Sequence, residues 1–153
     1  MQDFLDREAI RETMARYTIA GDRLREEDFI ACFTADAIME SEHVPEADAF
    51  RYQGRDAIRH WISRWSDAPK SAHQATFVRH HLTTSLIELT GSASATGRTY
   101  WIAYTDIGAD HAGYYLDEFR KEGGAWLIAH RRVRLDWRAP NSLFSAVVAN
   151  TRG

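Results

Sequence analysis

The alternation of apolar and polar positions is strongest between Phe77 and Tyr104. Two alternating runs flank Thr90-Gly91-Ser92, a turn composition, so the pattern predicts a β-hairpin. Side chains on a strand alternate between its two faces, and His80 and His81 are therefore expected to point in opposite directions. On strict alternation the face of His80 also carries Leu82, Thr84 and Leu86.

The segment before this hairpin shows helical spacing of its apolar residues. Asp3 is placed to cap the first helix, and Gly21 suggests its end or a kink. The predicted elements are helices at 3–20, 26–33 and 56–65, a short strand at 37–40, and a polar loop or flap at 41–50.

After the hairpin the sequence continues as β structure. Gly123-Gly124 separates two further alternating runs, which is typical of a second hairpin. We expect a loop at 106–113, strands at 114–121 and 126–137, and a short helix or tail at 141–150. Helices followed by a meandering sheet predict a single α+β domain over 1–153, with a cone-shaped, curved antiparallel sheet around the N-terminal helices and a pocket at the mouth of the cone.

Composition excludes several classes of function. The net charge of −3 leaves no basic footprint for nucleic acid. No apolar stretch is long enough for a membrane helix, so we expect a cytoplasmic protein. Cys32 is the only cysteine and no histidine spacing suits a metal, so we expect neither a metal nor a nucleotide cofactor. The aromatic content of 12% fits either a pocket for a flat ligand or an aromatic core.

Three polar residues interrupt otherwise apolar patterns: Asp22 after the first helix, His80 within a strand and Arg131 in the last strand. A carboxylate beside an imidazole fixes its tautomer and raises its basicity, as a general base requires, and a guanidinium stabilises a developing anion. The alternatives are a helix cap for Asp22, a core or surface histidine, and an arginine paired with an acidic residue on an adjacent strand.

These residues occur within motifs that resemble the SnoaL-like branch of the nuclear-transport-factor-2-like superfamily. The resemblance covers about residues 7–137. The motifs are Tyr17-x-x-Ala20-x-Asp22, Phe33-x-x-Asp36-Ala37, Tyr52-x-Gly54-x-x-Ala57-Ile58, His80-His81-Leu82-Thr83-Thr84, Gly91-x-Ala93 and Gly124-x-Trp126-x-Ile128-x-x-Arg131.

The resemblance implies roles for individual residues. Asp22 and His80 fall where scytalone dehydratase and hexachlorocyclohexane dehydrochlorinase carry a catalytic pair, and Arg131 falls on the dehydrochlorinase arginine. His111 lies near a second dehydratase histidine. Thr84 replaces a common asparagine, which puts substrate orientation in doubt. The expected substrate-binding residues are Tyr17, Trp61, Phe77, Thr84, Trp101 and His111.

Two functions follow as hypotheses. The first is a cofactor-independent lyase or isomerase that acts on a small apolar, cyclic or aromatic substrate, with His80 as base, Asp22 as its partner, and Arg131 or Tyr17 polarising the substrate. The second is a non-catalytic ligand-binding or assembly domain, similar to a ring-hydroxylating dioxygenase small subunit. Under either hypothesis the resemblance implies a homo-oligomer, a dimer or a trimer.

Overall fold

The computed structural model describes residues 1–43, 49–66 and 75–144. Three helices and six strands confirm the α+β class. In chain order they are α1 (Gln2–Asp22), α2 (Glu26–Ile30), β1 (Phe33–Ser41), β2 (Arg51–Gln53), α3 (Arg55–Ser66), β3 (Arg79–Leu89), β4 (Ser94–Thr105), β5 (Gly108–Glu122) and β6 (Ala125–Arg138).

The strands form one sheet in the order β2-β1-β6-β5-β4-β3. Consecutive hairpins join β3 to β6, and the turn residues predict the first and the last of the three. These ladders and the β1–β2 ladder are antiparallel. The β1–β6 ladder is parallel, so the sheet is mixed. It brings the N-terminal half of the chain beside the last strand.

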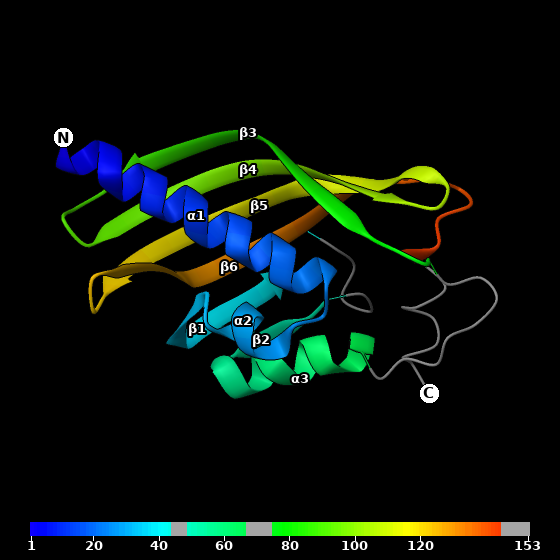
Figure 1. Cartoon of the computed structure of the whole chain (residues 1–153), viewed down its shortest axis with the longest axis horizontal. Coiled ribbons are helices and arrows are strands. Elements are labelled where there is room, and N and C mark those ends of the chain that lie inside the picture. The colour runs from blue at the N-terminus through cyan, green and yellow to red at the C-terminus, as the bar shows by residue number, and fades with distance from the viewer. Residues whose placement is uncertain (44–48, 67–74, 145–153) are drawn as a thin grey trace.

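The helices cover one face of this sheet and leave the other face open (Figure 1). The buried positions of α1 pack against the sheet, and Thr13 donates a hydrogen bond to the carbonyl of Trp126 at 2.6 Å. Asp6 accepts from the indole of Trp126 and from Lys121, both at 2.8 Å. These contacts attach the first half of α1 to the β5–β6 hairpin and so set the position of the helix on the sheet.

Strand β3 contains a bulge between Leu82 and Ser85, which advances three residues while β4 advances two, from Trp101 to Thr99. A bulge reverses the side-chain alternation beyond it. The alternation expected from the sequence therefore holds from His80 to Leu82 and is wrong afterwards. Past the bulge, Ile87 is buried and Leu86 is 61% exposed.

Several predicted boundaries differ from the structure. Met1, not Asp3, is the N-cap of α1, and it makes no side-chain cap bond. The second helix ends at Ile30, because Phe33 pairs with Ile128 and opens β1. The loop expected at 106–113 is wrong, since β5 begins at Gly108.

Other sequence predictions concern residues outside the described ranges. They include residues 44–48 of the 41–50 flap and residues 145–150 of the 141–150 tail. The pocket at the mouth of the cone stays a prediction. None of the helices among the described residues is long and apolar enough to cross a membrane.

Candidate functional site

Asp22 and His80 are in direct contact. Asp22 is the last residue of α1, and one carboxylate oxygen lies 2.6 Å from Nδ1 of His80. The other oxygen accepts the backbone N–H of His80 at 3.0 Å. A carboxylate at a helix C-terminus faces the unfavourable end of the helix dipole, so this position favours a partner that compensates it. The two hydrogen bonds fix both the ring and the strand that carries it.

This contact leaves Nε2 of His80 without a hydrogen-bond partner among the described residues. An ionised carboxylate has no proton to donate, so a neutral imidazole in this contact carries its hydrogen on Nδ1 and its lone pair on Nε2. The His80 side chain is 26% exposed, whereas the Asp22 side chain is 6% exposed. A buried carboxylate behind a partly accessible imidazole is the arrangement of a general base.

His111 forms a second aspartate–histidine pair next to the first. Its Nδ1 lies 2.7 Å from the carboxylate of Asp110, and the side chain is buried. The ring centroids of His80 and His111 are 5.8 Å apart, and each ring lies 5.6 Å from that of Trp101. Residues from three strands therefore place two imidazoles around one indole.

Electrostatics favour a neutral His111 beside an ionised Asp110. Burial lowers the pKa of His111, although the hydrogen bond to Asp110 opposes this shift. Burial alone would raise the pKa of Asp110, but hydrogen bonds from Ser142, His111, Leu143 and Thr105 outweigh it and lower the pKa to about 2. At neutral pH the second pair thus holds one negative charge.

Aromatic rings form a closed circuit that includes His111 and Trp101. Neighbouring rings in this circuit have centroid distances between 4.2 and 6.0 Å. The circuit runs Tyr17, Phe29, Trp61, Trp65, Phe144, His111, Trp101, Tyr115 and back to Tyr17. It joins all three helices to β4, β5 and the segment after β6, so the two histidines lie in an apolar, aromatic environment.

Arg131 does not join the Asp22–His80 pair. Its guanidinium is fully buried and makes two hydrogen bonds to Asp117, at 2.8 and 2.7 Å. The rings of Tyr17 and Tyr115 lie 4.1 and 4.0 Å from its Cζ. Burial alone would lower the pKa of Arg131, but the contact with Asp117 outweighs burial and raises the pKa above its usual value. The guanidinium is therefore cationic. Its Nη1 has no hydrogen-bond partner among the described residues.

The remaining predicted site residues divide between the interior and the open face. Tyr17 and Trp101 are buried, and Trp61 stacks on Phe29 at 5.8 Å. Phe77 is exposed and lines a hollow with His81 on the open face of the sheet. Thr84 is exposed within the β3 bulge, where the reversed alternation turns it outward.

Sequence reasoning missed Asp110, Asp117, Tyr115 and Phe144. Asp117 carried a usable signal, because it lies between Tyr115 and Phe119 on the apolar face of its strand. Asp110 gave none, since adjacent strand residues normally point to opposite faces. The β5 register skips Asp110, pairing His111 with Ala103 and Ala109 with Tyr104, and this bulge lets its carboxylate reach His111.

No group of three or more metal-ligating side chains occurs among the described residues. The two Asp–His pairs place two imidazoles and two carboxylates close together. The site thus combines a partly accessible imidazole, a buried second imidazole and surrounding aromatic rings within an α+β fold.

The SnoaL-like domain family matches residues 2–132, and the chain belongs to this family. The match contains the Asp22–His80 pair, His111 and Arg131. It confirms the resemblance found in the sequence motifs. A comparison with curated proteins finds no match.

Solved structures share the fold at low sequence identity. A candidate scytalone dehydratase from Novosphingobium aromaticivorans is 20% identical, with a TM-score of 0.76 over 90% of this chain and 89% of that one. A hexachlorocyclohexane dehydrochlorinase from Novosphingobium barchaimii is 16% identical, with a TM-score of 0.72 over 91% and 92%. The β subunit of a candidate aromatic-ring-hydroxylating dioxygenase from N. aromaticivorans is 18% identical, with a TM-score of 0.69 over 86% and 90%.

Proposed function

We propose that this protein is a cofactor-independent lyase or isomerase that acts on a small apolar, cyclic or aromatic substrate. The observation that carries the proposal is the two-point contact between Asp22 and His80, which leaves Nε2 of a partly accessible imidazole without a partner among the described residues. The family includes dehydratases and dehydrochlorinases, in keeping with elimination chemistry.

In the proposed reaction, Nε2 of His80 removes a proton from a carbon or oxygen of the substrate. The electron pair left behind either expels a leaving group from the adjacent atom, which is elimination, or is reprotonated elsewhere, which is isomerisation. Asp22 stabilises the imidazolium that forms, because it already accepts the Nδ1 hydrogen. A base positioned in this way contributes roughly 10²- to 10⁴-fold in rate.

His111 is the second group of the proposed site. Its ring is 5.8 Å from that of His80, and its Nε2 acceptor suits a hydroxyl group of a bound ring that donates to it. Arg131, expected from the sequence to polarise the leaving or carbonyl group, is bound to Asp117 and contacts the rings of Tyr17 and Tyr115 by cation–π interaction.

Deuterium incorporation tests the proposal on a panel of compounds and does not require the natural substrate. The protein is incubated in D₂O with small cyclic ketones, hydroxylated rings and halogenated rings, and mass spectrometry follows both deuterium uptake and product mass. Proton abstraction by His80 predicts uptake or elimination for at least one compound. Equal rates with the wild type and His80→Gln across every reactive compound would remove His80 from the mechanism.

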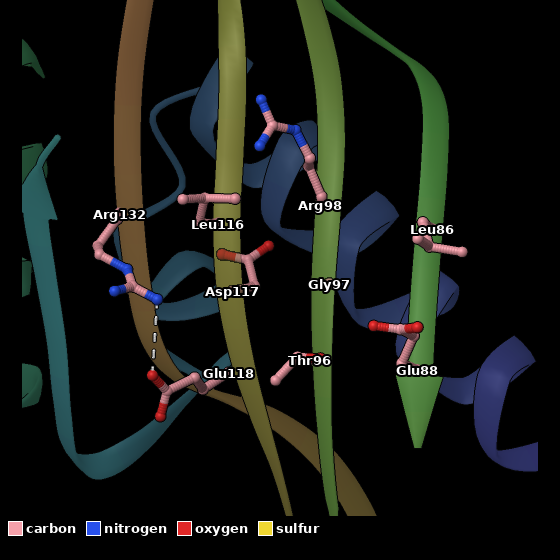
Figure 2. A pocket seen from close by; sticks show the side chains of 9 residues that line it. All are labelled: Leu86, Glu88, Thr96, Gly97, Arg98, Leu116, Asp117, Glu118 and Arg132. Carbon is pink, nitrogen blue, oxygen red and sulfur yellow. Dashed lines mark ion pairs between the residues drawn. The ribbon is translucent and has the colours of Figure 1, made fainter. Parts of the chain in front are cut away.

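The open face of the sheet supports a second candidate function, assembly with another copy of the chain. Exposed Leu86, Tyr100 and Tyr104 lie on this face, away from the helices. A shallow hollow crosses β3 to β6 there (Figure 2). Its register aligns two rows. The one with two arginines, called the basic row, is Leu86, Arg98, Leu116 and Arg132, and the one with two glutamates, called the acidic row, is Glu88, Thr96, Glu118 and His130.

This charge pattern is complementary to itself. A two-fold axis that lies between the rows, parallel to the interface, sets the basic row of each copy opposite the acidic row of the other. Arg98 would then extend toward Thr96 of the second copy and lie between the glutamates of its acidic row. We therefore propose a homodimer through this face, compatible with either a catalytic or a non-catalytic interior.

A further inference from the structure

We infer that Asp110 is a positioning residue that fixes the tautomer of His111 and attaches the segment after β6 to the same imidazole. The inference rests on the proposed function for its catalytic meaning, because His111 is the second group of that site. Its structural content, a tautomer and a hydrogen-bonded attachment, can be measured without a substrate.

The Asp110 carboxylate is fully buried and accepts four hydrogen bonds. One oxygen lies 2.7 Å from Nδ1 of His111 and accepts from the hydroxyl of Ser142. The other accepts from the hydroxyl of Thr105 and from the backbone N–H of Leu143, both at 2.9 Å. The Asp110 carbonyl also accepts from the N–H of Ala139 at 2.7 Å. A carboxylate with this many donors is acceptor-only and ionised.

These donors differ in whether they can also accept a hydrogen bond. The hydroxyls of Ser142 and Thr105 can rotate and become acceptors, whereas the backbone N–H of Leu143 can only donate. The group facing Leu143 must therefore be an oxygen. With a carboxylate the group facing His111 is an oxygen as well, so His111 holds its hydrogen on Nδ1 and keeps Nε2 as an acceptor.

The same carboxylate orders the residues that cover His111. Leu143 is bound through its backbone, and the ring of the next residue, Phe144, stacks on His111 with centroids 4.2 Å apart and planes at 29°. The charged and titratable groups that influence His111 are Asp110, His80 on β3 and Arg138 on β6. Asp110 thus couples the chemical state of the imidazole to the placement of the Phe144 ring.

Asp110→Asn separates these two effects. The oxygen of the new amide must still face the Leu143 N–H, which turns the amide NH₂ toward His111. His111 must then accept at Nδ1 and carry its hydrogen on Nε2. We expect this variant to keep the attachment of Leu143 and to reverse the tautomer, so that the site offers a donor where the wild type offers an acceptor.

The test is a two-bond ¹H–¹⁵N correlation spectrum of the full chain with ¹⁵N-labelled histidine. The wild type should show His111 protonated on Nδ1, and Asp110→Asn should show it protonated on Nε2. Ser142→Ala, the matched control, removes one hydrogen bond to the same oxygen and should leave the Nδ1 tautomer unchanged. A wild-type His111 protonated on Nε2 would overturn the inference, even if the Asn variant fails to fold.

Hydrogen exchange tests the attachment. The Leu143 amide should exchange about tenfold faster in Asp110→Ala, which loses the acceptor, and at the wild-type rate in Asp110→Asn. Equal exchange in all three proteins would show that Asp110 does not hold the segment. Because neither experiment uses a substrate, their failure leaves the proposed role of His80 unaffected, and the failure of that role leaves the tautomer result intact.

Discussion

His80 and His81 are consecutive on β3 and lie in different environments. The ring of His80 bonds to Asp22 and faces the aromatic circuit, whereas His81 is exposed and packs edge-on against Tyr104 at 5.2 Å on the open face. Adjacent residues of the same type, on the same strand, therefore form a matched pair for mutagenesis.

His80→Gln is expected to lower the rate of proton abstraction by about 10²- to 10⁴-fold, since Nε2 of the imidazole is lost as a base. His81→Gln should retain the wild-type rate. Deuterium uptake with the reactive compounds of the panel, at equal protein concentration, measures both. A comparable loss in both variants would indicate a general effect of the strand and not catalysis.

Asp22→Asn is expected to abolish activity while the fold is kept. One carboxylate oxygen accepts the backbone N–H of His80, a donor that cannot reverse, so the new amide must present its NH₂ to Nδ1. The imidazole then takes the Nε2–H tautomer and has no lone pair for the substrate; an effect of about 10⁴-fold is expected for such a tautomer error. Histidine ¹⁵N shifts and circular dichroism measure the tautomer and the fold. A variant that is active with Nδ1 protonated would contradict this.

Acid is expected to destabilise the protein through the second Asp–His pair. Asp110 has a lowered folded-state pKa of about 2 against 3.8 unfolded, so its contribution of about 2 kcal/mol is complete above pH 3.8 and is lost as the pH falls toward 2. His111, whose pKa is also lowered, adds a loss that begins as the pH falls below 6.5, because the unfolded chain binds a proton that the folded chain does not. Urea unfolding between pH 7 and pH 2 measures both effects. In Asp110→Asn the loss below pH 3.8 should be smaller by that amount.

Arg131→Met is expected to reduce the free energy of unfolding by about 3–5 kcal/mol, because Asp117 would remain buried without its partner. The double variant Arg131→Met with Asp117→Leu should lose less than the single variant, since it leaves no unpaired charge. Urea unfolding at pH 7 measures both. A double variant as unstable as the single one would assign the loss to the cation–π packing with Tyr17 and Tyr115.

Leu116→Glu is expected to convert a dimer to a monomer. The substitution places a negative charge between Arg98 and Arg132, which can then pair with it within the same copy. The same charge would face the glutamates of the acidic row in the second copy and repel them. Ile19→Glu, at an exposed position of α1, is the control of equal charge. Analytical ultracentrifugation at matched ionic strength measures both. A wild type that is monomeric, or a Leu116→Glu dimer, would exclude this interface.

The sequence predicted the contact that matters most and missed the residues that surround it. Asp22 and His80 were identified because a polar residue in an apolar pattern can be seen in one dimension and because the family motifs contain both. Arg131 was identified for the same reason, but its partner was not. The predicted hairpin places the two strands side by side, whereas the register shift between Glu118 and Phe119, which sets Asp117 opposite Arg131, leaves no mark in the sequence. Asp110 was not identified, because a bulge moved its carboxylate to the side of His111, against strand alternation.

The bulge in β3 gives the strand two phases. Before it, even-numbered residues such as His80 and Leu82 face the interior; after it, odd-numbered residues such as Ser85 and Ile87 do. Removing Thr84 would restore one phase along the whole strand, and either the imidazole or the hydrophobic residues beneath α1 would then face solvent. One added residue thus lets a single strand turn the imidazole of His80 inward at one end and the side chain of Ile87 inward at the other.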